Sequence, residues 1–166
     1  MQKIDSPYKP RTKTPEQALS LLMRQCARAE RCSSDALRSM RRWGLSEGDA
    51  GEVLRRLVAE RFIDDGRYAA AYVREKMKFS GWGARKIAAA LRTKKIAPNL
   101  IASALEQMEP ESDLERLEEM LRRKAAKTTA RNAYDLKGKL VRFGVGRGFD
   151  LDQVIPIVER IVRDDD

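Results

Sequence analysis

The sequence repeats one helical pattern of apolar residues three times, and this repeat limits the possible fold more than any other feature. Counting from Ser46, Ala97 and Asp150, the positions four, seven, eight and eleven residues further on are apolar in every copy. The starting points lie 51 and 53 residues apart. Such spacing is typical of a helix face that packs against a core. The three sets are Ala50, Val53, Leu54 and Leu57; Ile101, Ala104, Leu105 and Met108; and Val154, Ile157, Val158 and Ile161.

Two further helices are expected before each of these faces. The middle helices are predicted at about 34–43, 83–94 and 131–145. The first helices of the first two copies carry apolar residues at positions 51 apart, whereas the third copy matches more loosely. Their apolar sets are Ala18, Leu21, Leu22 and Cys26; Ala69, Tyr72, Val73 and Met77; and Leu114, Leu117, Leu121 and Ala125.

Capping residues support these helix boundaries. Thr14 precedes Pro15, which combines a good N-cap with proline at the first helical position. Gly44 and Gly148 suit the left-handed conformation that ends many helices. Lys95 stands at the equivalent place in the second copy, so we expect a different cap there. The remaining predicted start residues are Ser46, Asp65, Gly83, Pro98 and Asp150.

The fold class that follows is all-α, with three tandem three-helix repeats in an elongated, curved array. Each repeat is too small to bury much surface alone, so neighbouring repeats should share a core. No segment alternates apolar and polar residues convincingly, and little or no strand is expected. The predicted organisation is a flexible N-terminal segment at 1–13, repeats at 14–64, 65–109 and 110–163, and an acidic tail at 164–166.

The composition argues against several classes of function. Histidine, the commonest general base and zinc ligand, is absent from the chain. We therefore expect no enzyme, no metal site and no cofactor. No apolar run reaches the roughly 18 residues of a membrane span, so a cytoplasmic protein without a membrane partner is expected. Cys26 and Cys32 are interpreted as one small core residue and one incidental thiol rather than a disulfide.

Positive charge is segregated along the sequence. The net charge is +9, and residues 65–99 and 122–147 each hold nine Lys or Arg, against two and one Asp or Glu. Such clusters favour an anionic partner, although a lone charge run is usually a solvated face. The candidate partner- or DNA-binding residues are Lys76, Lys78, Arg85, Lys86, Arg92, Lys94, Lys95, Arg122, Arg123, Lys124, Lys127, Arg131, Lys137, Lys139, Arg142 and Arg147.

Three short motifs have competing explanations. Asp64 and Asp65 could be a paired carboxylate site, but capping explains Asp65 without further help. Trp82 could be buried between helices or could stand exposed as a stacking platform for a base, and burial is favoured. Gly81 and Gly83 do not form a phosphate loop, because no Gly-Lys-Ser/Thr ending follows a strand.

The residues Phe-Ile-Asp-Asp-x-Arg-Tyr-Ala at 62–69, followed by Gly-x-x-Lys-Ile at 83–87, resemble the core signature of the RecX family. The resemblance is strong over 60–108, fair over 14–60 and weaker over 110–163. Gly66 and Lys95 depart from the common pattern, which puts only the helix ends in doubt. The signature residues are expected to form scaffold: Phe62, Asp64, Asp65, Arg67, Tyr68, Ala69, Gly81, Gly83, Ile87 and Leu91.

The resemblance implies a regulator of RecA that is built from tandem three-helix repeats. It implies binding as a monomer along the groove of the RecA filament, where single-stranded DNA could also be contacted. It further implies restraint of filament growth, ATP hydrolysis, strand exchange and the co-protease role in the SOS response to DNA damage.

Two other hypotheses compete with this one, and only the first stays open from the residues alone. The chain could be a stand-alone DNA-binding protein with helix-turn-helix-like units, since three-helix units can place a helix in the major groove. It lacks an obvious set of Asn, Gln and Arg on one helix for reading bases. An enzyme is disfavoured, because no nucleophile–base pair is recognisable.

Overall fold

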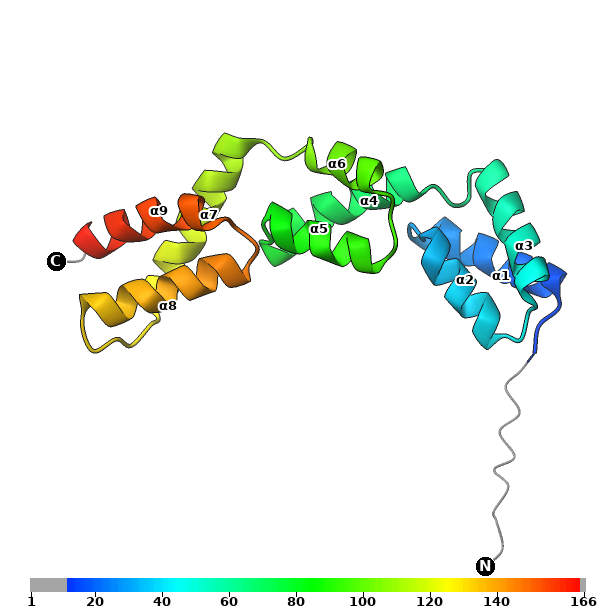
Figure 1. Ribbon diagram of the computed structural model, residues 1–166, viewed down its shortest axis with the longest axis horizontal. Helices are drawn as coiled ribbons and strands as arrows, with labels where there is room; N and C mark the ends of the chain where they lie inside the picture. Colours follow the sequence, from blue (N-terminus) through cyan, green and yellow to red (C-terminus); the bar gives the residue numbers. More distant parts are fainter. Residues whose placement is uncertain (1–11, 165–166) are drawn as a thin grey trace, which may run out of the picture. The chain divides into compact units, whose positions relative to one another are not determined.

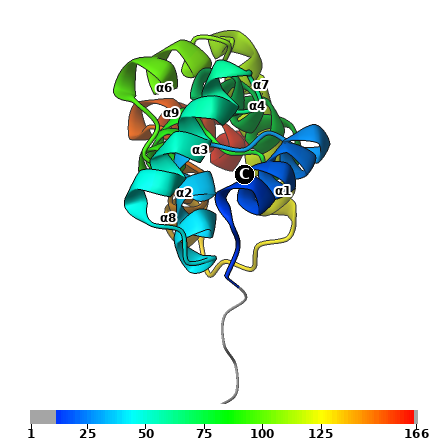
Figure 2. The same ribbon diagram turned by 90° about the vertical axis from the view of Figure 1, so that its right-hand side faces the viewer.

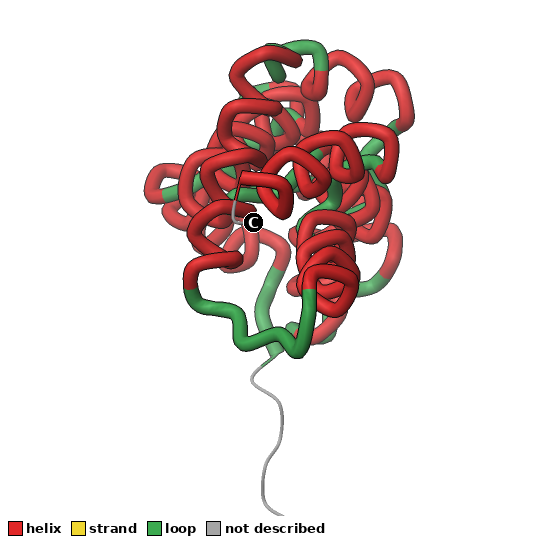
Figure 3. The backbone as a smooth tube through the Cα atoms, turned by 90° about the vertical axis from the view of Figure 1, so that its left-hand side faces the viewer, coloured by secondary structure: helices red, strands yellow, loops and turns green. Residues whose placement is uncertain are grey.

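The computed structural model describes residues 12–164, and within that range helices are joined by short loops without a β-strand (Figures 1 and 3). The chain divides into two compact units between Tyr68 and Ala69. The prediction of an all-α fold made of three-helix repeats is confirmed. Most of the expected flexible N-terminal segment, and the last two residues of the acidic tail, lie outside the described residues.

Unit 1 contains α1 (Pro15–Arg28), α2 (Ser33–Arg42) and α3 (Glu47–Ala59), and α3 packs against both other helices (Figure 2). Thr14 and Gln17 form a reciprocal capping box at the start of α1. The Ser46 hydroxyl accepts the backbone N–H of Asp49 and so caps α3. The core is built from the predicted apolar faces, with Leu22, Met40, Leu57 and Ile63 almost fully buried.

The predicted role of Asp65 as the cap of the next helix is wrong. Helix α4 (Asp65–Glu75) begins at Asp65 itself, and its N-terminal N–H at Arg67 donates to Asp64 Oδ1 at 2.9 Å. Asp65 Oδ1 instead accepts the backbone N–H of Ser33 at 2.8 Å, at the first residue of α2. The two carboxylates therefore serve two different helix starts, because adjacent residues project in different directions.

The remaining helices belong to unit 2, which α4 enters at Ala69. Helix α4 continues into a π-helical turn, η1 (Lys76–Ser80), which ends at Gly81 with φ +63°. A π turn of this kind is uncommon and often lies at a functional site. The helices that follow are α5 (Ala84–Thr93), α6 (Pro98–Leu105), α7 (Pro110–Ala126), α8 (Ala133–Gly146) and α9 (Leu151–Asp164).

The core of unit 2 uses the predicted helix faces. Helices α8 and α9 pack closely against each other and against α7. Their fully buried side chains include Leu117, Leu121, Leu140 and Val154, with Phe149 beside them. In the second repeat the fully buried residues are Ala69, Val73, Ile87 and Leu91.

The expectation of a different cap at Lys95 is also wrong. Lys95 itself adopts the left-handed conformation, with φ +57°, as Gly44 and Gly148 do with φ +80° and +99°. The backbone N–H of Ile96 donates to Leu91 O, which repeats the bond from Leu45 to Met40 O in the first repeat. These bonds and the buried side chain of Ile96 hold Lys95 in a conformation that a residue with a Cβ rarely takes.

The second and third repeats meet at a seam of close backbone contacts. Gly83 N donates to Arg147 O at 2.7 Å, and Arg85 N donates to Gly148 O at 3.1 Å. A Cβ on Gly83 would lie 2.5 Å from Gly148 O. Gly83 was predicted as a weak cap, and it is the N-cap of α5, but the close approach gives glycine a further reason to stand there.

Candidate functional site

The structure brings five of the sixteen candidate basic residues to one concave surface of unit 2. This surface, the basic groove, has a volume of about 610 Å³ and lies where η1 meets α7 and α8. Its lining is basic and apolar, with a single carboxylate. The residues are Met77, Lys78, Phe79, Ser80, Gly81, Arg116, Glu119, Met120, Arg123, Lys124, Lys127, Phe143 and Arg147.

One face of helix α7 forms a wall of the basic groove. Met120, Arg123, Lys124 and Lys127 follow the spacing i, i+3, i+4, i+7, which places them on one side of a helix. The turn η1 contributes Lys78 and Phe79 to the same lining. Six basic side chains thus face one carboxylate, Glu119, within a small volume.

The cations of the basic groove differ in how they are held. Lys78, Lys124 and Lys127 have no carboxylate within ion-pair distance among the residues that the structure describes. Arg123 pairs with Glu119 one turn earlier on α7. Arg147 donates to Ser80 O at 3.1 Å, so it is tied to the backbone of η1.

Sequence reasoning did not single out six residues of the basic groove: Phe79, Ser80, Arg116, Glu119, Met120 and Phe143. Phe79 is 77% exposed, an unusual value for a large aromatic side chain. Arg116 donates to Met77 O at 2.6 Å and pairs with Asp113. Phe143 has the Lys124 ammonium and the Arg147 guanidinium 5.2 and 5.1 Å from its ring centroid. The local signal in the sequence was an aromatic residue, Phe79, directly after Lys78 in a basic stretch.

At least six candidate residues are engaged in ion pairs instead of standing free for a partner. Arg85 pairs with Asp150, Arg123 with Glu119, and Lys137 with Glu159. Arg131 and Lys139 share Asp135, and Arg122 pairs with both Glu118 and Asp164. The hydrogen bond from Lys137 holds the pKa of Glu159 below its usual range. The Arg131 backbone N–H, followed by Lys139, lowers the pKa of Asp135. The paired candidates are Arg85, Arg122, Arg123, Arg131, Lys137 and Lys139.

Several candidates lie outside the basic groove. Lys76 and Lys86 place their ammonium groups 4.9 and 4.6 Å from the centroid of the Trp82 ring. Trp82 is partly buried, so it is neither a core residue nor a bare stacking platform. Lys94 and Lys95 stand at the end of α5, just after Arg92. A second hollow of about 680 Å³ on α8 and α9 includes Arg131, Lys137 and Arg142, together with Asp135 and Glu159.

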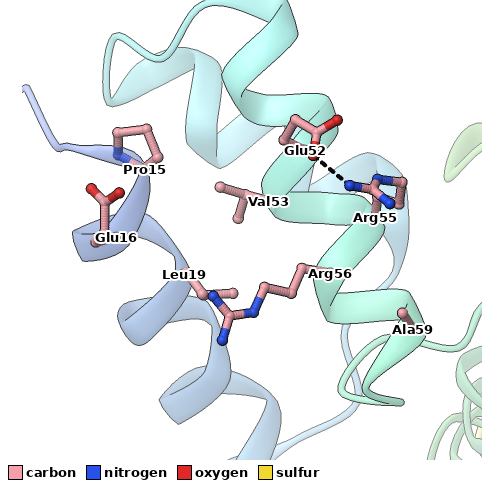
Figure 4. A pocket seen from close by; sticks show the side chains of 8 residues that line it. All are labelled: Pro15, Glu16, Leu19, Glu52, Val53, Arg55, Arg56 and Ala59. Carbon is pink, nitrogen blue, oxygen red and sulfur yellow. Dashed lines mark hydrogen bonds and ion pairs between the residues drawn. The ribbon is translucent and has the colours of Figure 1, made fainter.

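Unit 1 has a smaller pocket between α1 and α3, with a volume of about 330 Å³ (Figure 4). Leu19 and Val53 contribute its apolar surface. Its charged side chains are largely compensated, since Arg55 pairs with Glu52 at 2.6 Å and Arg56 with Glu60 at 3.0 Å. The basic groove is therefore the stronger candidate for an anionic partner.

Among residues 12–164, no three His, Cys, Asp or Glu side chains are grouped so that they could hold a metal ion. Within the same range, no helix is long and apolar enough to cross a membrane. Cys26 and Cys32 are free thiols, and burial raises the pKa of both.

Comparison with protein families finds two matching models. One describes the second three-helix domain of RecX and matches residues 64–105, and the other describes the third three-helix domain of RecX and matches residues 111–156. Together the matches cover more than half of the chain. They include every residue of the basic groove.

Comparison with individual proteins gives the same picture. The regulatory protein RecX of Mycolicibacterium smegmatis is 28% identical over 153 residues, covering 90% of this chain and 81% of the relative. The regulatory protein RecX of Streptomyces coelicolor is 29% identical over 148 residues, covering 87% and 79%.

Two solved structures share the fold. The crystal structure of RecX from Lactobacillus salivarius has a TM-score of 0.73 at 22% identity, covering 89% of this chain and 96% of that chain. Another crystal structure of regulatory protein RecX has a TM-score of 0.78 at 23% identity, covering 90% and 73%.

Proposed function

Since the chain belongs to the RecX family, we propose that it modulates RecA recombinase, mainly as a negative regulator. In this proposal it binds as a monomer along the RecA filament on single-stranded DNA, in the cytoplasm. It limits filament growth, ATP hydrolysis, strand exchange and co-protease activity. The relatives are named regulatory proteins, which supports a role that depends on binding.

The observation that carries the proposal is the basic groove inside the two family-matched repeats. Its lysines at 78, 124 and 127 offer positive charge that nearby carboxylates do not neutralise. A filament of protein on DNA presents negative charge along its length. Complementary charge speeds the encounter of two partners and helps to align their surfaces. We propose the repeat boundaries 14–64, 65–109 and 110–163 as the units that follow the filament.

The test is the rate of ATP hydrolysis by RecA on single-stranded DNA as this protein is added. Wild-type protein should lower the rate at close to stoichiometric ratios. Reversing two charges in the groove with Lys124→Glu and Lys127→Glu should raise the concentration needed for half inhibition by about tenfold or more, because attraction becomes repulsion.

The matched control is Arg24→Glu with Arg28→Glu. Both residues are exposed and lie near the C-terminal end of α1, as Lys124 and Lys127 lie near the C-terminal end of α7. Reversing both charges changes the net charge of the protein by the same amount. The control should inhibit like the wild type. Absence of inhibition by wild-type protein would count heavily against RecA regulation, and tight sequence-selective duplex binding without RecA would favour the stand-alone DNA-binding alternative.

A further inference from the structure

The basic groove is lined by apolar side chains as well as by charged ones. Met77 and Met120 are partly buried, and Met120 Sδ lies 2.6 Å from where a Cβ on Gly81 would stand. Thioether side chains adapt to apolar partners of different shape. Phe79 adds a third apolar side chain, which is 77% exposed. A purely electrostatic site has no need for these residues.

The shape of the groove is fixed by contacts that do not involve a ligand. Arg116 and Arg147 donate to Met77 O and Ser80 O, at 2.6 and 3.1 Å. Both carbonyls belong to η1, which carries Lys78 and Phe79. Gly81 ends the turn in the left-handed conformation. A site that is already shaped loses less free energy on ordering when a partner binds.

The lysines without a carboxylate partner come from two separate elements. Lys78 lies on η1, whereas Lys124 lies on α7 and Lys127 is its C-cap. The ring of Phe143 has Lys124 and Arg147 against it, and the Lys78 ammonium lies 5.4 Å from the centroid of the Phe79 ring. A lining that combines two methionines and an exposed phenylalanine with lysines that lack a carboxylate partner matches an apolar side chain flanked by carboxylates.

We infer that the basic groove docks an acidic peptide segment of a partner protein that carries one aromatic or long aliphatic side chain. That side chain packs against Phe79, Met77 and Met120. The flanking carboxylates pair with Lys78, Lys124 and Lys127. The inference rests on the proposed function in that the groove is taken as the surface that faces the partner.

Fluorescence anisotropy of the full chain with three labelled probes tests the inference. The probes are the peptide EEDFEDE, the same peptide with Ser in place of Phe, and a thymidine oligonucleotide of similar charge. The Phe peptide should bind about tenfold or more tightly than the Ser peptide, because only it buries an aromatic side chain. It should also bind more tightly than the oligonucleotide at equal salt.

Two variants locate the site. Phe79→Ala should remove most of the preference for the Phe peptide while leaving the weak binding of the Ser peptide, since an exposed side chain contributes little to folding. Lys124→Glu with Lys127→Glu should weaken both peptides by about tenfold or more. Arg24→Glu with Arg28→Glu should change neither. Thermal unfolding by circular dichroism must show that each variant is folded.

Three outcomes would overturn the inference. Equal affinity for the two peptides would show that the groove does not bind an apolar side chain. Tighter binding of the oligonucleotide, lost in Phe79→Ala, would make the groove a nucleic-acid site. Self-association of the protein in sedimentation, abolished by the Lys124 and Lys127 reversals, would make a second copy the occupant. If the protein inhibits RecA but binds the Phe and Ser peptides equally, only this inference is contradicted. If it prefers the Phe peptide but does not inhibit RecA, only the proposed function is contradicted.

Discussion

Substituting Gly83 by alanine should disrupt the seam between the second and third repeats. Gly83 and Gly148 are both buried, and the added Cβ would lie 2.5 Å from Gly148 O and 2.8 Å from Phe149 N. These are backbone atoms, which cannot rotate away as a flexible side chain can. The backbone segments at Gly83 and Gly148 must therefore move apart, or α5 must shift.

The magnitude follows from the bonds that such a shift weakens. The seam contains Gly83 N to Arg147 O at 2.7 Å and Arg85 N to Gly148 O at 3.1 Å. Each backbone hydrogen bond contributes about 0.5–1.5 kcal/mol net, and a buried donor left without a partner costs about 1–3 kcal/mol. Alanine is also a poorer N-cap than glycine. We expect a loss of about 2–4 kcal/mol in the free energy of unfolding of unit 2.

Urea unfolding followed by tryptophan fluorescence measures this loss. The chain has two tryptophans, Trp43 in unit 1 and Trp82 in unit 2, so a Trp43→Phe background restricts the signal to the unit that carries the seam. With a slope of about 1–2 kcal/mol per M urea, the midpoint should fall by about 2 M.

Two companion variants separate the causes. Gly146→Ala lies in α8 with nothing within 4 Å of the added Cβ, and it should be neutral or stabilise by up to about 1 kcal/mol. Gly83→Ser restores a good N-cap but keeps the Cβ, so it should remain destabilised. The steric reasoning is refuted if Gly83→Ser matches the wild type, or if Gly146→Ala loses as much stability as Gly83→Ala.

Three further predictions concern other positions. Lys95→Gly should stabilise the protein by about 1 kcal/mol in thermal unfolding, because it removes the strain of a Cβ at φ +57°; destabilisation would contradict the strain. Lys94→Glu with Lys95→Glu should weaken binding to the RecA filament and leave the far-ultraviolet circular dichroism unchanged, whereas lost helicity would mean a structural role. The pKa of Asp135, measured by NMR, should lie below the ordinary value of an aspartate and should move upward in Lys139→Met. Because folding lowers this pKa, its contribution to stability is present above about 4 and disappears as the pH falls through the folded pKa; an unchanged titration in Lys139→Met would exclude the ion pair as a cause.

Helix periodicity was sufficient to predict the cores. Of the twelve apolar positions predicted for the third helices, all but Leu54 and Leu105 are buried, and those two are half-buried. The prediction works because burial on one helix face is a local property with a fixed spacing of residues. The third repeat's first helix was predicted more loosely, and its Leu114 is indeed 38% exposed.

Contacts between elements were beyond the sequence pattern. The separate roles of Asp64 and Asp65 depend on α2 lying beside the start of α4. Lys95 is held at positive φ by its neighbours, although its own side chain disfavours that conformation. The preference of a single residue for one backbone conformation over another amounts to about 1 kcal/mol in free energy, and a few packed side chains and hydrogen bonds outweigh it.

The sequence by itself determined the three-helix repeats, the apolar faces that build their cores, the segregation of positive charge and the RecX signature. Each of these is written in the spacing or identity of residues close together along the chain. Only the tertiary structure decided which of the basic residues act together. It paired six of them with carboxylates and brought Lys78 and Phe79 into the lining of one groove with Lys124 and Lys127. The first two residues are more than forty positions from the last two, and only the packing of η1 against α7 brings them to one surface.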